Sequence, residues 1–236
     1  MDRLENGAKK LGIFLNQKNL EKFEVYYREL VDWNKRINLT RITDYDDVQV
    51  KHFLDSLTVL AAIDPDGLKV IDVGTGAGLP GIPLKIACPG LNLTLLEATA
   101  KKTRFLEQLA IKLELANVAI ETGRAEEIAH DGAYREKFDI TLSRAVAALP
   151  ALAELTLAFC KVGGCCVVQK KGDIGSEVEH SHNAIGKMGG RLREVKAVKL
   201  EEFAGERYLV IIDKVQATPP QYPRRPGLPV KRPLLS

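Results

Sequence analysis

The sequence predicts an α/β fold with a mostly parallel β-sheet, preceded by helices. Three features indicate it. Strand-like and helical runs alternate from residue 68 to residue 169, a turn with three alternating glycines follows the first strand, and two strand-like runs at residues 193–213 form a hairpin. Strands that alternate with helices pair in parallel and are covered on both faces. The hairpin makes the last strand antiparallel.

Residues 1–62 predict a helical segment that packs on the following domain. Apolar side chains recur at helical spacing from Leu20 to Val31, with charged side chains between them, and again from Asp46 to Ala62. Beyond this segment the pattern changes to strands. We therefore divide the chain into a helical segment (1–62), a sheet-containing domain (63–215) and a tail (216–236).

Five runs predict the parallel strands: Leu68–Val73, Leu91–Leu96, Val118–Glu121, Phe138–Ser143 and Gly164–Gln169. Helical patterns at Lys101–Leu115 and Ala151–Cys160 separate some of them. Two further strand-like runs, Arg193–Leu200 and Arg207–Asp213, form the hairpin. From Lys214 to the last residue there are six prolines, five basic residues and no acid, so we expect the tail to be extended and not a third domain.

Composition bounds the function. The formal net charge of +3 is too small to identify a nucleic-acid binder. The four cysteines form no C-x-x-C pair, which predicts reduced thiols and no metal site. The first residues lack an apolar export signal, and no apolar run approaches the ~20 residues that span a bilayer. We expect a cytoplasmic monomer that does not bind a membrane.

The turn after the first predicted strand indicates a ligand. Residues 70–81 read V-I-D-V-G-T-G-A-G-L-P-G, and Gly74, Gly76 and Gly78 leave bare backbone for a nucleotide-like ligand. D-x-G-x-G-x-G is typical of S-adenosylmethionine (AdoMet) sites, whereas G-x-G-x-x-G at residues 76–81 is a dinucleotide fingerprint. Asp72 favours AdoMet, because it would repel a pyrophosphate and accept from a cationic amino group. A nicotinamide dinucleotide is the alternative.

Ligands of open α/β sheets lie beyond the carboxyl ends of the strands. Glu97 ends the second predicted strand and fits ribose hydroxyls of either ligand. Glu126 follows the third strand, where it either contacts adenine or complements a helix N-terminus. Arg144 ends the fourth strand, and we expect it to bind a carboxylate, a phosphate or guanine O6. A surface ion pair is the alternative for Arg144.

Five βα units followed by a hairpin resemble the class I methyltransferase architecture. In such enzymes the methyl acceptor lies at the fourth strand, here residues 143–145. This stretch has neither an N-P-P-aromatic run for an exocyclic amine nor a cysteine for attack on a pyrimidine C5. Guanine N7 needs neither, since its lone pair attacks directly and no proton leaves. Catalysis would then depend on positioning and electrostatics.

Two N-terminal features could contact RNA. Residues 33–41, W-N-K-R-I-N-L-T-R, combine an aromatic ring, amides and basic side chains, which suits single-stranded RNA. A helix C-terminus with favourable basic residues is the alternative. His52 lies one helical turn from Asp55 and Ser56, and it either contacts the substrate or forms a structural hydrogen bond.

Three runs together closely resemble the bacterial RsmG family, also called GidB. They are W-N-K-R-I-N-L-T at 33–40 followed by K-H-F-L-D-S at 51–56, D-V-G-T-G-A-G-L-P-G-I-P-L at 72–84, and Y-P-R-R-P-G-L-P at 222–229. The resemblance implies a Rossmann-like class I AdoMet-dependent methyltransferase with a seven-stranded sheet. It also implies that the substrate is N7 of a specific guanine in a loop of 16S ribosomal RNA.

Together with the residues at the strand ends and in the N-terminal segment, the resemblance gives the expected site. The cofactor-binding residues are Asp72, Gly74, Gly76, Gly78, Leu79, Glu97, Ala125, Glu126 and Arg144. Those near the transfer site are Arg144, Arg124, His52 and Asn38. The basic residues expected against RNA are Lys35, Arg36, Lys102, Arg104, Arg224 and Arg225. A non-catalytic rRNA-binding factor and a nicotinamide-dependent oxidoreductase are the alternatives.

Overall fold

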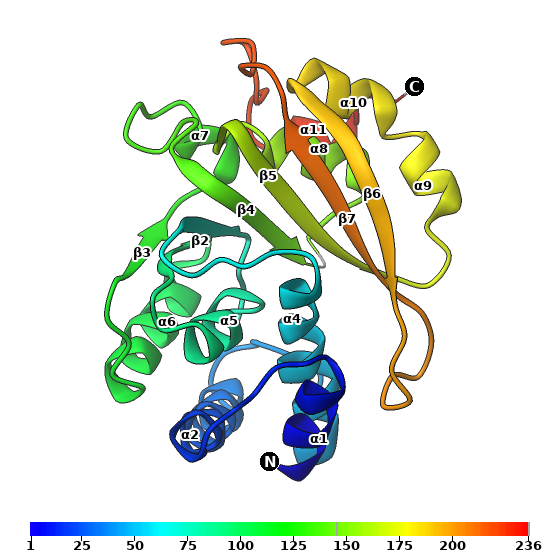
Figure 1. Cartoon of the computed structure of the whole chain (residues 1–236). Helices are drawn as coiled ribbons and strands as arrows, with labels where there is room; N and C mark the ends of the chain where they lie inside the picture. Colours follow the sequence, from blue (N-terminus) through cyan, green and yellow to red (C-terminus); the bar gives the residue numbers. More distant parts are fainter. Residues whose placement is uncertain (145, 236) are drawn as a thin grey trace.

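A seven-stranded sheet forms the centre of the computed structural model, which describes residues 1–144 and 146–235 (Figure 1). The strand order is β3-β2-β1-β4-β5-β7-β6. The strands are β1 (Lys69–Val73), β2 (Asn92–Glu97), β3 (Val118–Thr122), β4 (Phe138–Arg144), β5 (Cys160–Lys171), β6 (Gly190–Val198) and β7 (Arg207–Lys214). Strands β1 to β5 pair in parallel, and β7 is antiparallel to both β5 and β6. The predicted mostly parallel sheet with a terminal hairpin is confirmed.

Helices cover both faces of the sheet (Figure 1). They are α1 (Asp2–Lys10), α2 (Gln17–Asn34), α3 (Tyr45–Val48), α4 (Asp55–Leu57), α5 (Gly81–Ala87), α6 (Ala100–Lys112), α7 (Ala125–Ile128), α8 (Leu149–Thr156), α9 (Gly175–Glu179), α10 (His182–Lys187) and α11 (Leu228–Lys231). Alternate side chains of a strand point to opposite faces. Accordingly Cys165 and Val167 of β5 join the core beneath the N-terminal helices, whereas Cys166 and Val168 join the core beneath α8 and α10.

The N-terminal segment is helical, as predicted, and shares one hydrophobic core with the sheet. Leu4, Phe23 and Leu54 belong to the same buried cluster as Val70 of β1 and Leu93 of β2. We propose that the chain consists of a helical segment (1–62), a sheet-containing domain (63–215) and a tail (216–236). Because the first two share a hydrophobic core, they form one packed unit.

The second predicted helix, residues 46–62, is not uniformly α-helical. Between α3 and α4 lies a π-helical turn (Gln49–Leu54), and a 3₁₀ turn (Thr58–Ala61) follows α4. A π-turn adds a residue to one helical turn and thereby rotates the next residues about the helix axis. Such turns are frequent at functional sites.

The tail is more structured than the extended segment expected from its prolines. It contains α11 and packs against α8. The guanidinium of Arg135 donates hydrogen bonds to the carbonyl oxygens of Thr218, Pro219 and Tyr222. These bonds hold the proline-rich chain against the domain at successive points. High proline content therefore does not make this tail independent of the fold.

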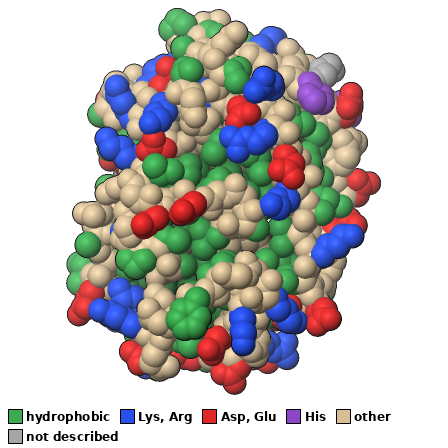
Figure 2. All heavy atoms as spheres, in the orientation of Figure 1, with side chains coloured by type: hydrophobic (Ala, Val, Ile, Leu, Met, Phe, Trp, Pro, Cys, Tyr) green, Lys and Arg blue, Asp and Glu red, His purple; other side chains and the backbone are tan. Residues whose placement is uncertain are grey.

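Two further findings concern the described residues as a whole. No helix within residues 1–144 and 146–235 is both long and apolar enough to cross a membrane. On the face drawn in Figure 2, lysine and arginine side chains are interspersed with aspartate and glutamate. This mixture agrees with the small net charge of the chain.

Candidate cofactor and acceptor site

The glycine turn after β1 is an open cradle of backbone. Gly74 and Gly76 have φ values of +72° and +60°, which favour glycine. A Cβ on Gly74 would lie 2.7 Å from Val146 Cγ2. A Cβ on Gly76 would meet only the carbonyl oxygen of Gly74, at 4.0 Å, so the space beside Gly76 is open. The turn therefore leaves room for a ligand against its backbone.

Asp72 stabilises this turn by hydrogen bonds on its buried side. Its Oδ2 accepts hydrogen bonds from the Thr75 hydroxyl at 2.7 Å and from the Gly81 backbone N–H at 2.9 Å. The side chain is fully buried, and burial raises the pKa of the carboxyl to about 6. Asp72 does not line the cavity on the open side of the turn. The structure therefore shows Asp72 holding the turn, and the expected direct contact between Asp72 and the cofactor stays a prediction.

Three neighbouring cavities lie along the carboxyl edge of the sheet. The first, about 490 Å³, is bordered by the glycine turn, Glu97 and Arg144. The second, about 340 Å³, shares Gly74 and Arg124 with the first and extends to α7 and α11. The third, about 390 Å³, shares Arg144 and His52 with the first. Volumes of this size suit small-molecule ligands.

Glu97 is positioned to bind a diol. Its Oε2 accepts the Gly76 N–H at 3.1 Å and its Oε1 accepts the Thr99 N–H at 2.9 Å. These two bonds orient the carboxylate at the end of β2. Each oxygen keeps lone-pair capacity for a further donor. The residues present therefore fit an adenosine ribose at this point of the first cavity.

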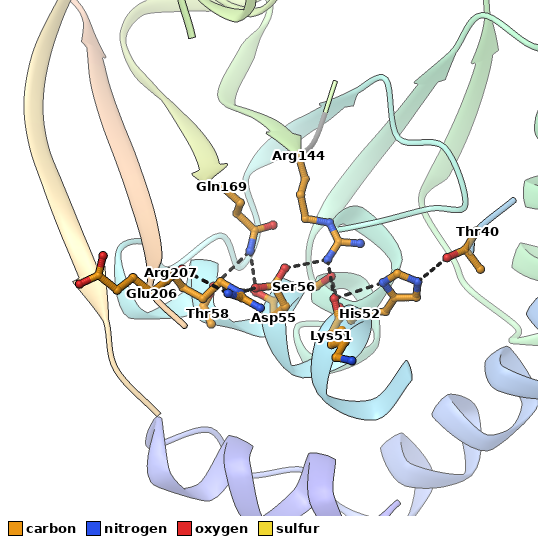
Figure 3. A network of polar contacts seen from close by, with 10 residues as sticks. All are labelled: Thr40, Lys51, His52, Asp55, Ser56, Thr58, Arg144, Gln169, Glu206 and Arg207. Carbon is orange, nitrogen blue, oxygen red and sulfur yellow. Dashed lines mark hydrogen bonds and ion pairs between the residues drawn. The ribbon is translucent and has the colours of Figure 1, made fainter. Parts of the chain in front are cut away.

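Arg144 lines both the first and the third cavity. Figure 3 shows its contacts with Asp55 and Lys51. Its Nη1 donates to Asp55 Oδ2 at 2.8 Å and to the Lys51 carbonyl oxygen at 3.3 Å. The other oxygen of Asp55 accepts from Arg207 Nε at 3.0 Å, and the amide nitrogen of Gln169 donates to the Asp55 carbonyl oxygen. The side chains of Asp55, Arg144 and Arg207 are each 12–15% exposed. Arg144 is therefore in an ion pair, but a largely buried one at a cavity wall.

His52 is held neutral by its surroundings. Its Nδ1 lies 3.2 Å from the Lys51 carbonyl oxygen and its Nε2 lies 2.8 Å from the Thr40 hydroxyl. A carbonyl only accepts, so Nδ1 carries the proton and Nε2 accepts from Thr40. Burial, assisted by the charge of Arg144, lowers the pKa of His52 to about 4. The histidine thus forms the structural hydrogen bond that was its alternative role, while still lining both cavities.

The remaining expected cofactor residues are distributed unevenly. Leu79 lines the first cavity, Ala125 and Glu126 line the second, and Arg124 lines both. Gly78 borders neither, because it packs against Ile82 and Leu106. The expected acceptor stretch 143–145 includes Ala145, which lies outside the described residues.

The predicted RNA contacts near residues 33–41 divide into two groups. The Trp33 ring packs edge-on against Phe105, 5.7 Å between centroids, so it supports the core and is not a free stacking platform. Lys35 and Arg36 are exposed and pair with Asp32. Asn38 is exposed and borders none of the three cavities, although the next two residues border the first.

The other basic candidates also differ from one another. Lys102 lines the first cavity, and Arg104 and Arg225 are exposed. Arg224 instead forms a two-pronged ion pair with Glu154, whose side chain is fully buried. Its guanidinium therefore holds the tail to α8, and the expected contact between Arg224 and RNA stays a prediction.

Several residues at the site escape sequence reasoning. Gln169 and Lys170 lie in the last three residues of β5, and Arg207 begins the antiparallel β7. All three therefore lie at the carboxyl edge of the parallel strands and line the third cavity. The strand-end rule that selected Glu97 and Arg144 also applies to β5. Arg207 reaches Asp55 only because β7 lies next to β5 in the sheet, and the sequence does not show this neighbour.

Comparison of the sequence with protein families decides the assignment. The family model described as rRNA small subunit methyltransferase G matches residues 19–209. The chain belongs to this family. The Ribosomal RNA small subunit methyltransferase G of Dehalococcoides mccartyi (strain CBDB1) is 52% identical over 236 residues, covering 100% of both chains. That of Lachnoclostridium phytofermentans is 46% identical over 230 residues, covering 97% of this chain and 95% of its own.

Solved structures confirm the fold. A SAM-dependent methyltransferase from Aquifex aeolicus superposes with a TM-score of 0.52 at 17% identity, covering 73% of this chain and 94% of its own. M. jannaschii TYW2 in complex with AdoMet superposes with a TM-score of 0.53 at 15% identity, covering 74% and 80%. The chain has the class I methyltransferase fold. As a member of the rRNA small subunit methyltransferase G family, it is an AdoMet-dependent methyltransferase of small-subunit ribosomal RNA.

Proposed function

We propose that this enzyme methylates N7 of one guanine in a loop of 16S ribosomal RNA. The supporting observation is the junction between the first and third cavities. Its two principal side chains are a fixed arginine and a neutral histidine whose ring nitrogens are both engaged in hydrogen bonds. Neither is poised to remove a proton. N7 of guanine is an acceptor that loses no proton on methylation, so it matches this junction.

The first and second cavities together would hold AdoMet, which supplies an electrophilic methyl group on a sulfonium. Glu97 would accept hydrogen bonds from the ribose hydroxyls. The backbone of Gly74 and Gly76 would lie beside the methionine part, and Arg144 would bind its carboxylate. Residues 125–126 would border the adenine. This assignment places each ligand group beside a residue of matching chemistry.

The third cavity would hold the acceptor guanine. Its polar lining includes Gln169, Lys170 and Arg207, which can contact the base and the neighbouring phosphates. Both the sulfonium and 7-methylguanine are cationic, so a guanidinium in line with the moving methyl group would oppose transfer. The ion pair with Asp55 holds the Arg144 guanidinium and offsets its positive charge. The arginine can then orient a ligand without facing the methyl group.

Exposed basic side chains would complete the RNA contact. The proposed set is Lys35, Arg36, Lys102, Arg104 and Arg225, with Asn38 beside the entrance to the first cavity. Contacts from lysine and arginine to phosphates make binding dependent on salt. We further propose that the enzyme acts as a monomer in the cytoplasm.

The direct test uses AdoMet with a labelled methyl group. We incubate the enzyme with small ribosomal subunits that lack the modification, or with naked 16S rRNA, and identify the labelled nucleoside after digestion. We expect label on 7-methylguanosine at a single site. Label on another nucleoside would contradict the acceptor assignment.

Two further outcomes separate the alternatives. Cofactor and rRNA binding without transfer to either RNA substrate would favour a non-catalytic rRNA-binding factor. Thermal stabilisation by NADH and not by AdoMet would favour an oxidoreductase. Gly76→Val is the matched negative control, since a β-branched side chain at φ +60° is strained and would occupy the cradle.

A further inference from the structure

The C-terminal segment reaches the cofactor cavities from the far end of the chain. The second cavity is bordered by residues 123–126 after β3 and, from the tail, by Gly227, Val230 and Lys231. It shares Gly74, Ala98, Arg124 and Val146 with the first cavity. The tail and the glycine turn therefore border adjoining parts of one space, although about 150 residues separate them in the sequence.

Hydrogen bonds to two buried carboxylates fix the tail at this place. Glu126, only 6% exposed, accepts the backbone N–H of Gly227 at 2.8 Å. Glu154, fully buried, accepts both the backbone N–H and the guanidinium of Arg224. His130 Nε2 also donates to the carbonyl oxygen of Pro223 at 2.8 Å. Contacts on α7 and α8 thus set the position of α11 at the cavity.

Two exposed apolar side chains border this space. Val146 is 41% exposed and lines both cavities, and Val230 is 55% exposed and lines the second. Apolar surface gains free energy when a ligand removes it from water. A purine ring has apolar faces and a polar edge. It therefore suits a cavity with exposed valines and the buried carboxylate of Glu126.

The order of groups along the sheet fixes which part of AdoMet reaches the tail. The glycine turn follows β1, and the diol-binding carboxylate of Glu97 follows β2. With the ribose at Glu97, the attached base would extend toward the end of β3, where the second cavity lies. The methionine part would extend the opposite way, toward Arg144 at the end of β4.

We propose that residues 227–231 form one wall of the adenine end of the cofactor site, with Val230 covering the purine. The inference rests on the proposed placement of the ribose at Glu97. The tail then has a function in cofactor binding and not only in stability. Lys231 lies at the rim of the same wall.

Val230→Asp tests the inference. Val230 is already exposed, so the substitution leaves folding unchanged, but a bound purine would remove the new carboxylate from water. We titrate S-adenosylhomocysteine into the enzyme in a calorimeter, without RNA. We expect the dissociation constant of Val230→Asp to be about tenfold or more above that of the wild type. The matched control is Leu235→Asp in the same tail, which is 52% exposed and borders none of the three cavities.

Two ligands distinguish the ends of the site. S-adenosylhomocysteine carries the whole skeleton, whereas 5′-methylthioadenosine lacks the amino-acid part. Val230→Asp should weaken both by a similar factor, and Leu235→Asp should weaken neither. Arg144→Ala should weaken only S-adenosylhomocysteine. Hydrogen exchange at the amides of residues 230–232 should slow when either ligand binds the wild-type enzyme.

The outcomes separate this inference from the proposed function. If the wild-type enzyme binds both ligands and Val230→Asp binds them equally well, the role of the tail is overturned while the cofactor site stands. Weakened S-adenosylhomocysteine with unchanged methylthioadenosine would place Val230 at the amino-acid end and also overturn it. If the wild-type enzyme binds neither ligand, the cofactor assignment and the inference fail together.

Discussion

Arg144 and His52 are oriented by neighbouring residues before any ligand binds. Arg144 bonds to Asp55 and to the carbonyl oxygen of Lys51, and the same carbonyl accepts from His52 Nδ1. The Thr40 hydroxyl holds the other ring nitrogen. Groups fixed in this way lose little conformational freedom when the substrate arrives. The site is therefore suited to a reaction that depends on orientation.

The neutral state of His52 predicts a simple pH dependence. Because its pKa lies near 4, the imidazole does not change charge at neutral pH. We expect the single-turnover rate of methylation to be flat between about pH 6 and pH 9 with respect to this group. A change in this rate near pH 6.5 would contradict a neutral His52 if it disappears in His52→Asn. The change should then persist in the control His180→Asn, which replaces an exposed histidine.

Local patterns predict part of the site and miss the rest for a physical reason. The glycine turn, Glu97 and Arg144 follow from residue types at strand ends, which short sequence windows contain. Whether Asp72 faces the ligand or the turn depends on hydrogen bonds that form only once the turn closes. Trp33 is covered by Phe105, a neighbour far along the chain. Contacts over such separations have no local signature.

The π-helical turn between α3 and α4 has an effect that a regular helix lacks. His52 lies within the turn and contacts Thr40, whereas Asp55 begins α4 and contacts Arg144 and Arg207. The apolar periodicity of residues 46–62 predicts a continuous helix and cannot reveal the extra residue in one turn. The sequence pattern therefore identifies His52 and Asp55, but it does not show that they contact different residues.

Replacing Asp55 tests how much this element contributes. Asp55→Ala removes the shared partner of two largely buried arginines, so we expect unfolding free energy to fall by about 3 kcal/mol. Asp47→Ala is the matched control, because its ion pair with Lys51 is 41–45% exposed and is worth less than about 1 kcal/mol. Urea denaturation measures both. Equal losses would show that the Asp55 network is no stronger than a surface pair.

At the scale of the whole molecule, both terminal segments are tied to the central domain. The N-terminal helices share the core with β1 and β2, and the tail is anchored to Glu126 and Glu154 (Figure 1). Proline content suggests an extended tail because composition carries no information about distant carboxylates. The mostly parallel sheet and the terminal hairpin, in contrast, follow from the alternation of elements and are confirmed, whereas the order of the strands in the sheet is known only from the structure.

A double-mutant cycle tests the anchoring of the tail. Arg224→Met leaves the buried carboxylate of Glu154 without its cation and should lower unfolding free energy by about 3–5 kcal/mol. Adding Glu154→Met removes that carboxylate and should recover a large part of the loss. The exposed pair of Arg193 and Asp213, treated in the same way, should show little coupling. Strict additivity of the Arg224 and Glu154 substitutions would contradict the predicted coupling.

The position of β7 has a consequence for how the chain is made. β7 is the last strand in the sequence, yet it lies between β5 and β6 in the sheet. During synthesis, β5 therefore keeps an open edge until residues 207–214 leave the ribosomal tunnel, and β6 waits for the same residues to pair. Open strand edges are templates for association with other chains. A nascent chain held on the ribosome after β5 has emerged would thus expose the open edge of β5 to association with other chains.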